Sequence, residues 1–459
     1  MPTASESLTK YNWIPQPAAQ RILDHIVDDF LGECPRAAGL AGRMKAETGT
    51  RFKDWIDSIH LPKTAQLESH LMEVGFSREA QPGAADCYVH HGAMFPAVVL
   101  ESGGPVRICI KVDSVADFVA TWQLHGCPIG GEPLSQLRRA TVFKERNAEL
   151  LAVERHGYRG FVATAYQAAK AIAAVRHLEA FRTRDRDLGD DALGYAHAEK
   201  LYDAAAAEIG RDWATDLFFW CEREFWQRRN RAAQVQKARQ DKLGLGWANH
   251  DHHTYRCSRE TFKEHVGLLE KMGFTCRESF YAGAEAGWGA QVMDHAVCGL
   301  TTFNDVDMSP EELLGDFAHA GFTQRQTTLG TVGLWCALHG QAMLQAGMHH
   351  LECQFDHHAL VEQLERKAGV KTMAPFTTFP YLRQAFTYGE QWAVLPERVG
   401  PLVEAGLISR EQGEMFIKDG SLGSHLENLE RNDGFKGFNQ QGVSDIIART
   451  DPRMMAGVH

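Results

Sequence analysis

The sequence contains no C-x-x-C pair and no stretch that approaches about 18 consecutive apolar residues. Without paired cysteines, a disulfide framework or a zinc ribbon is disfavoured, and the ten scattered cysteines are typical of free thiols in a reducing compartment. The first residues also lack the basic start and apolar centre of a signal peptide. We therefore expect a cytoplasmic protein without a membrane partner.

Runs rich in lysine and arginine are absent too, and the formal net charge is -11. Binding to phosphate backbones needs clustered cations, so we expect no nucleic-acid partner. A small anionic substrate is still compatible with this charge, because one or two well-placed arginines are enough to bind it. The chain has 459 residues, which is enough for two domains or more.

Alternating helical and strand-rich stretches predict an α+β fold. Helical spacing dominates the start, the middle and the end of the chain, and short strands with glycine turns fill the two regions between. The predicted parts are an N-terminal helical segment at 1–50, a first barrel domain at 51–160, a helical connector at 161–246, a second barrel domain at 247–400 with a helical insert at 309–346, and a mainly helical tail at 401–459.

The two strand-rich regions resemble each other in sequence. Residues 137–145 (LRRATVFKE) align without gaps on residues 382–390 (LRQAFTYGE). Upstream, VRICIKVDSVADFV aligns on HHLECQFDHHALVE, joined at Asp113 and Asp356, and HLMEVGF resembles GLLEKMGF still earlier. Three matches in the same order predict two copies of one domain, each with two strand–helix–strands units.

The copies differ at one position that matters for metal binding. His350 aligns with Arg107, whose guanidinium stays protonated and cannot serve as a neutral nitrogen ligand. Glu145 still matches Glu390. We therefore expect a metal-free scaffold in the N-terminal copy and the chemistry in the C-terminal copy.

Three residues that are distant in the sequence form a candidate metal site: His252, His350 and Glu390. Each histidine lies in the opening strand of a unit, and the glutamate lies in a last strand. Two histidines and one carboxylate on one face of an ion leave three adjacent positions open, as in non-haem Fe(II) oxygenases. Both histidines have a histidine neighbour, at 253 and 349, and strand alternation decides which member of each pair points inward. Asp251 or Asn249 could orient a ligand histidine.

The residues around this candidate site resemble one enzyme family. Asp251–Arg256 is similar to the His-x-x-x-Arg opening of the 2-oxoadipate dioxygenase/decarboxylase family, also called hydroxyglutarate synthase. Met348–Leu351 resembles its Asn-His-hydrophobic strand, Tyr388–Gln391 its Gly-Glu strand, and Arg431–Asn439 the closing segment of its plant members. The resemblance covers roughly residues 250–450. The chain departs from the family pattern where His349 replaces the asparagine and where Trp392 follows Gln391.

The resemblance implies an α+β fold of duplicated vicinal-oxygen-chelate-like β-barrel domains, with a helical connector and helical inserts. The related 4-hydroxyphenylpyruvate dioxygenase also pairs a metal-free N-terminal copy with a catalytic C-terminal copy. By the same resemblance, Fe(II) is bound by His252 rather than His253, by His350 rather than His349, and by Glu390, which is the only carboxylate on its strand.

The implied reaction is the oxidative decarboxylation of a small 2-oxo acid such as 2-oxoadipate by O₂, with hydroxylation of the same molecule. The 2-oxo acid would chelate the metal ion through its carboxylate and keto oxygens. Arg256 lies four residues after His252 and on the same face of the strand, so it could bind a substrate carboxylate. Tyr388 lies two residues before Glu390 and could line the same cavity, as could Arg383, Gln384, Phe435 and Phe438.

Two alternative functions remain open at the level of the sequence. One keeps the fold and changes the chemistry, to a metal-dependent glyoxalase-like isomerase or lyase or to an extradiol-type ring-cleaving dioxygenase. The other is a non-catalytic protein that binds a small acid without metal. Zinc or nickel content without O₂ consumption would favour the isomerase.

Overall fold

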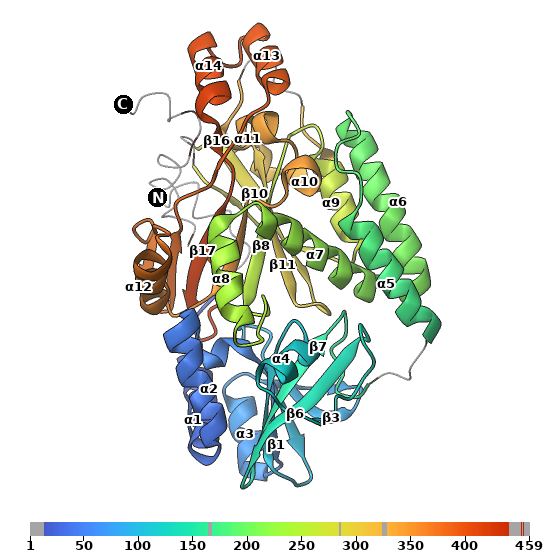
Figure 1. Cartoon of the computed structure of the whole chain (residues 1–459), viewed down its shortest axis with the longest axis vertical. Helices are drawn as coiled ribbons and strands as arrows, with labels where there is room; N and C mark the ends of the chain where they lie inside the picture. Colours follow the sequence, from blue (N-terminus) through green and yellow to red (C-terminus); the bar gives the residue numbers. More distant parts are fainter. Residues whose placement is uncertain are drawn as a thin grey trace.

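The computed structural model describes residues 13–163, 168–283, 286–323, 328–439, 451 and 453. Two mixed β-sheets dominate it, one from each half of the chain, with helices packed around them (Figure 1). Each sheet has its own large hydrophobic core. The core of the second sheet continues into the helices that connect the two halves.

The N-terminal half begins with helices and continues into a seven-stranded sheet with the order β2-β3-β4-β1-β5-β7-β6. Its elements are α1 (Pro17–Glu33), α2 (Pro35–Arg43), η1 (Met44–Thr48), η2 (Phe52–Trp55), β1 (Ile56–Pro62), α3 (Ala65–Glu73), β2 (Ser77–Gln81), β3 (Ala84–Val89), β4 (Ala97–Glu101), β5 (Val106–Lys111), α4 (Val115–Thr121), β6 (Leu137–Glu145) and β7 (Ala148–Arg155).

Four helices connect the two sheets. They are α5 (Ala168–Arg182), α6 (Asp191–Ile209), α7 (Arg211–Arg228) and α8 (Arg231–Asp241). In Figure 1, α5, α6 and α7 lie beside the second sheet, and their buried aromatic residues belong to its core. None of the described helices has both the length and the apolar character needed to cross a membrane.

The C-terminal half forms an eight-stranded sheet with the order β13-β14-β17-β12-β8-β11-β10-β9. Its elements are β8 (His250–Cys257), α9 (Phe262–Lys271), β9 (Thr275–Tyr281), β10 (Trp288–His295), β11 (Leu300–Asp307), β12 (His350–Gln354), α12 (His357–Ala368), β13 (Thr377–Phe379), β14 (Leu382–Phe386) and β17 (His425–Arg431). Between β11 and β12 lies an insert with η3 (Glu312–Leu314), α10 (Phe317–Ala320), α11 (Thr331–His339) and η4 (Ala342–Ala346).

The two sheets share one topology. The neighbouring strands β1, β5, β7 and β6 of the first sheet correspond to β8, β12, β17 and β14 of the second sheet. The parallel and antiparallel pairings agree between the two sheets. Each copy contains two strand–helix–strands units, so the predicted α+β fold with duplicated domains is confirmed. Among the described strands, the two end strands of each sheet do not pair with each other, so the expected barrels are open, half-barrel sheets.

The tail differs from the mainly helical segment that the sequence predicted. After β14 the chain leaves the sheet, forms β15 (Gln391–Trp392), α13 (Pro396–Glu404), α14 (Arg410–Asp419) and β16 (Ser421–Leu422), and then returns as β17. Strand β17 inserts between β12 and β14, in the middle of the sheet. Residues 440–450 of the predicted tail lie outside the described residues.

A buried ionic group joins the N-terminal copy to the connector. His156 follows β7, and its Nδ1 and Nε2 lie 2.9 Å from Asp216 Oδ2 on α7 and 3.1 Å from Glu154 Oε1. Burial alone would lower the pKa of His156, but hydrogen bonds to both carboxylates outweigh it and raise the pKa to about 9. A protonated His156 therefore holds two parts of the chain together.

Candidate metal centre

Three adjacent strands of the second sheet bring together one histidine and two glutamates. Glu352 on β12 is the cross-strand partner of both His252 on β8 and Glu427 on β17. Directly opposed residues on neighbouring strands point to the same face of a sheet. One ligand atom from each of the three residues lies within 4.8 Å of the others, and all three are buried. Such a row can hold a metal ion.

A second histidine joins the cluster from the same strand as Glu352. His350 Nε2 lies 2.7 Å from Glu352 Oε1, and His252 Nε2 lies 3.1 Å from the same oxygen. Thr254 Oγ1 donates a hydrogen bond of 2.9 Å to it. The oxygen of Glu352 is therefore the centre around which the two histidines converge.

The two glutamates of this cluster bind a proton with different affinities. Burial would raise the pKa of Glu352, but the charges of His252 and His350 outweigh burial and lower that pKa to about 2. Burial and the charge of Glu352 raise the pKa of Glu427 well above its usual value. Glu352 Oε2 is buried without a hydrogen-bond partner. A divalent ion next to this oxygen would offset the negative charge of both carboxylates when they are ionised, so the residues fit a metal.

Outer contacts fix the orientation of His252. Its Nδ1 lies 2.7 Å from Asp251 Oδ1, which leaves Nε2 directed toward Glu352. Arg431 donates two hydrogen bonds to Asp251, of 2.9 and 3.0 Å, and Gln354 donates a third of 2.9 Å. A carboxylate behind a histidine is the usual support of a metal-ligating imidazole.

Arg256 supplies a buried positive charge next to the cluster. It lies on the same face of β8 as His252 and lines the same cavity, whose volume is about 90 Å³. Its Nε and Nη1 are buried without hydrogen-bond partners. Asp305 is its cross-strand neighbour on β11, and burial raises the pKa of that carboxyl to about 7. The free N–H groups of Arg256 can bind the carboxylate of a ligand.

Aromatic rings also line the cavity. The ring of Phe303 lies 4.4 Å from His252 and 4.8 Å from Phe438, between ring centroids. Phe280 and Phe386 also line the space. The cavity thus combines polar side chains of β8, β12 and β17 with aromatic rings of β9, β11 and β14, as expected of a small-molecule site.

Of the five residues predicted for the site, the structure brings His252, His350 and Arg256 together in this cavity. Glu390 and Tyr388 do not line it. Glu390 Oε1 accepts a hydrogen bond of 2.8 Å from the backbone N–H of Arg231, at the start of α8. The side chain of Tyr388 is 56% exposed. The physical reason is that β14 ends at Phe386, so both residues lie on the segment that leaves the sheet.

Sequence reasoning did not find Glu352 and Glu427. The signal for Glu352 was present, because it follows His350 by two residues and therefore lies on the same face of the strand. The signal for Glu427 was weaker, since its strand follows β14 only after two helices. In the N-terminal copy, β7 follows β6 directly and pairs with it, so the duplication predicts a strand in the C-terminal copy that pairs with β14.

The equivalent row in the N-terminal copy has different residues. Ser58 pairs with Cys109, and Cys109 pairs with Leu151, at the positions of His252, Glu352 and Glu427. Arg107 stands at the position of His350 and forms ion pairs with Glu101 and Glu149. Serine, leucine and arginine are not usual metal ligands, so only the second copy carries a full ligand set.

No protein-family model matches the sequence, and no curated protein sequence matches it. Among solved structures, a hydroxyglutarate synthase from Oryza sativa in complex with 2-oxoadipate is 13% identical, with 52% of this chain and 94% of that chain covered and a TM-score of 0.33. A variant of 4-hydroxymandelate synthase from Streptomyces coelicolor is 11% identical, with 86% and 98% covered and a TM-score of 0.25. A methylmalonyl-CoA epimerase from Mycobacterium tuberculosis is 12% identical, with 40% and 89% covered and a TM-score of 0.23. At these scores, the fold assignment rests on the strand order and pairing described above.

Proposed function

We propose that the chain is an Fe(II)-dependent oxygenase that acts on a small 2-oxo acid. The observation that supports it is a buried cluster of two histidines and two glutamates, directly beside a buried arginine with free N–H groups. The family resemblance of the segments around His252, His350 and Arg256 leads to the same reaction. A 2-oxo acid of the 2-oxoadipate type is the substrate class.

The overall reaction balances with O₂ as the only oxidant. The carboxyl group next to the keto carbon leaves as CO₂. One oxygen atom converts the keto carbon to a new carboxylate, and the other becomes a hydroxyl group on the neighbouring carbon. The product is a 2-hydroxy acid that is one carbon shorter than the substrate.

We assign the ion to His252, His350 and Glu427, with Glu352 as a fourth side chain at the centre of the cluster. When bound, Fe(II) supplies the Lewis acid and the electrons for O₂ chemistry. His252 has a pKa of about 10 in this cluster, since the charge of Glu352 and the hydrogen bond to Asp251 outweigh burial. A proton and a metal compete for the same nitrogen, so loading would release the proton of His252.

Residues of the cavity would bind and shield the substrate. Arg256 would bind the distal carboxylate through its free N–H groups. Gln384 donates a hydrogen bond of 2.8 Å to Glu427 Oε1 and would hold this carboxylate in place. Phe303 and Phe438 would keep water away from the reacting carbons.

The test is anaerobic loading with Fe(II), followed by O₂ uptake across a panel of 2-oxo acids that includes 2-oxoadipate. We expect uptake by the wild type, and loss of both uptake and bound metal in His350→Ala and in Glu427→Gln. Glu390→Gln is the matched control, because Glu390 lies outside the cavity and its replacement should leave metal and uptake unchanged. Loss of metal in Glu390→Gln, with retention in Glu427→Gln, would overturn the assignment.

A second candidate function follows from the number of carboxylates. A six-coordinate ion with three protein ligands has room for a chelating 2-oxo acid and O₂, but a fourth ligand, Glu352, would leave room for the chelating substrate alone. That arrangement suits a glyoxalase-like isomerase or lyase, which needs no O₂. Bound zinc or nickel, four protein ligands by X-ray absorption and no O₂ uptake with any 2-oxo acid would favour this function.

A further inference from the structure

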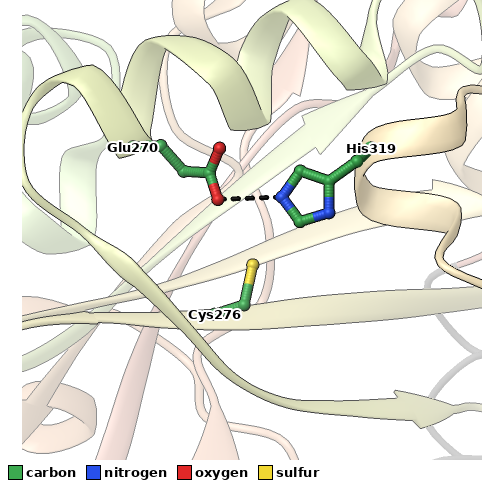
Figure 2. A group of neighbouring side chains, drawn as sticks. All are labelled: Glu270, Cys276 and His319. Carbon is green, nitrogen blue, oxygen red and sulfur yellow. Dashed lines mark hydrogen bonds and ion pairs between the residues drawn. The ribbon is translucent and has the colours of Figure 1, made fainter.

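A second cluster of metal-ligating side chains lies on the surface of the C-terminal copy. Glu270 comes from α9, Cys276 from β9 and His319 from α10, and one ligand atom of each lies within 4.8 Å of the others. Figure 2 shows the carboxylate, the thiol and the imidazole directed toward one another. None of the three lines the cavity of His252 and Arg256, so this cluster is separate from the proposed active site.

We propose that Glu270, Cys276 and His319 form a binding site for a zinc ion. A set of one sulfur, one nitrogen and one oxygen ligand suits Zn²⁺, whereas Ca²⁺ and Mg²⁺ prefer oxygen ligands alone. All three side chains are exposed and can adjust to the metal. His319 Nε2 now lies 2.8 Å from Glu270 Oε1, and zinc would replace this hydrogen bond by one bond to each residue. Water would complete a tetrahedral shell.

The histidine of this cluster already has an outer support. His319 Nδ1 lies 2.7 Å from Asp316 Oδ1, which leaves Nε2 as the nitrogen that faces Glu270 and Cys276. This is the carboxylate–histidine arrangement that accompanies zinc sites.

The cysteine is the accessible one of the ten. Cys276 is exposed, Cys127 is half-buried and the other eight are buried. The three ligands come from both ends of the turn between α9 and β9 and from the insert at 309–346. Phe317 and Phe322 of the insert already pack on Phe262 of α9, with centroids 5.8 and 5.6 Å apart. Zinc would clip the insert to this unit from the solvent side.

The insert that zinc would hold in place also contacts a residue of the proposed active site. Helix α11 belongs to it, and the ring of Trp335 on α11 lies 5.6 Å from the guanidinium carbon of Arg256. The zinc would thus have a structural role, and it would stabilise the insert whose Trp335 lies next to Arg256, without touching the substrate. This inference does not depend on the proposed oxygenase activity.

Cobalt binding to the full-length protein tests the site, because a thiolate bound to Co²⁺ gives a near-ultraviolet charge-transfer band. No cysteine lines the central cavity, so metal bound there gives no such band. We expect the band in the wild type and in His252→Ala, and its displacement by Zn²⁺. Cys276→Ser and His319→Ala should lose the band and one equivalent of bound zinc, and Cys127→Ser, the matched control, should keep both.

Affinity gives a second measurement that a folding defect would not imitate. Asp316→Asn should weaken zinc binding by about 10-fold, measured by competition with a chromophoric chelator, with an unchanged circular dichroism spectrum. The proposal is overturned if the wild type shows no thiolate band at saturating Co²⁺. It is equally overturned if the band persists in Cys276→Ser.

Discussion

At the scale of residues, the alternation of side chains along β8 separates chemistry from packing. His252 and Arg256 face the cavity, whereas His253 and Tyr255 face the connector, where Phe219 of α7 lies 5.4 and 6.2 Å from their rings. The strand is buried on both faces, so both sets are shielded from water. One face of β8 therefore supplies the reactive groups. The residues between them form part of the core that holds these groups in place.

Removing Arg256 should separate substrate binding from metal binding. In Arg256→Ala we expect bound metal to be retained and the KM for a 2-oxo dicarboxylate to rise roughly 10- to 100-fold, the scale of a lost charged hydrogen bond. Steady-state kinetics and metal content after gel filtration measure the two effects. Arg383→Ala is the control, since Arg383 is exposed on β14. A loss of metal in Arg256→Ala would contradict the role given to this arginine.

Asp251→Asn should weaken metal binding without removing a ligand. The amide keeps the shape of the side chain but removes the charge that orients His252 and is itself bound by Arg431. We expect a 10- to 100-fold loss of metal affinity, because the supporting carboxylate fixes the imidazole. Chelator competition measures it. Equal affinities in the variant and the wild type would show that Asp251 serves only to bind Arg431.

How much of the site could be predicted depends on how local the signal was. The resemblance indicated His252, and Arg256, four residues later on the same strand, was placed on the same face by the alternation of side chains. The carboxylate could not be placed in the same way. Glu390 and Glu427 both follow β14, and only the pairing of β17 with β12 shows which of them reaches the cavity.

At the scale of elements, the segment between β14 and β17 folds as a small module with its own core. In the N-terminal copy the counterpart strands β6 and β7 form a direct antiparallel pair with a short turn. Here α13 and α14 fill the connection, and their apolar residues pack on Leu334 and Leu338 of α11 in a separate cluster. The module thus covers α11 on the side away from the sheet.

Truncation of Leu338 should loosen this module more than the sheet. Leu338 is 1% exposed, and Leu338→Ala should cost about 2–5 kcal/mol through lost burial and a cavity. We expect faster hydrogen exchange in residues 396–419, with little change in β6 and β7. Leu71 in α3 is also fully buried, and Leu71→Ala should accelerate hydrogen exchange in β6 and β7 with little change in residues 396–419. Uniform acceleration across the chain in both variants would show that the module has no independent stability.

The duplication could be predicted from the sequence because the counterpart strands keep the same residue pattern, as in β6 and β14. The position of β17 could not, since an excursion through two helices separates it from the strand it pairs with. Its sequence, HLENLER, is short, has no apolar–polar alternation and carries three charged residues, and its place in the sheet depends on pairing with β12 and β14. Tertiary context, more than local propensity, determined this strand.

At the scale of the whole molecule, several polar contacts connect the N-terminal copy to the rest, and two buried ones reach the connector helices α7 and α8. His156 bridges Glu154 and Asp216 of α7, and Gln236 of α8 donates a hydrogen bond of 2.8 Å to the backbone carbonyl of Thr48. Both contacts are buried, so losing a partner leaves an unpaired polar group. These contacts fix the position of the N-terminal copy relative to the connector helices.

The charge on His156 makes the stabilisation from this contact depend on pH. Its folded-state pKa, about 9, lies above the ordinary value of 6.5, so the stabilisation is complete below about pH 6.5 and is lost as the pH rises through 9. The contribution is of order 3 kcal/mol. We expect the free energy of unfolding of the wild type to fall more steeply between pH 7 and 10 than that of His156→Gln. Parallel curves for the two proteins, measured in urea, would refute the charged bridge.

The placement of β17 also determines when the centre can form during synthesis. His252 and His350 leave the ribosome well before Glu427, which lies on the last strand to enter the sheet. A nascent chain that has been released only as far as α14 lacks Glu427, one of the four side chains of the cluster. Metal capture at this centre would therefore be a post-translational event, and unfinished chains would be poor competitors for the metal.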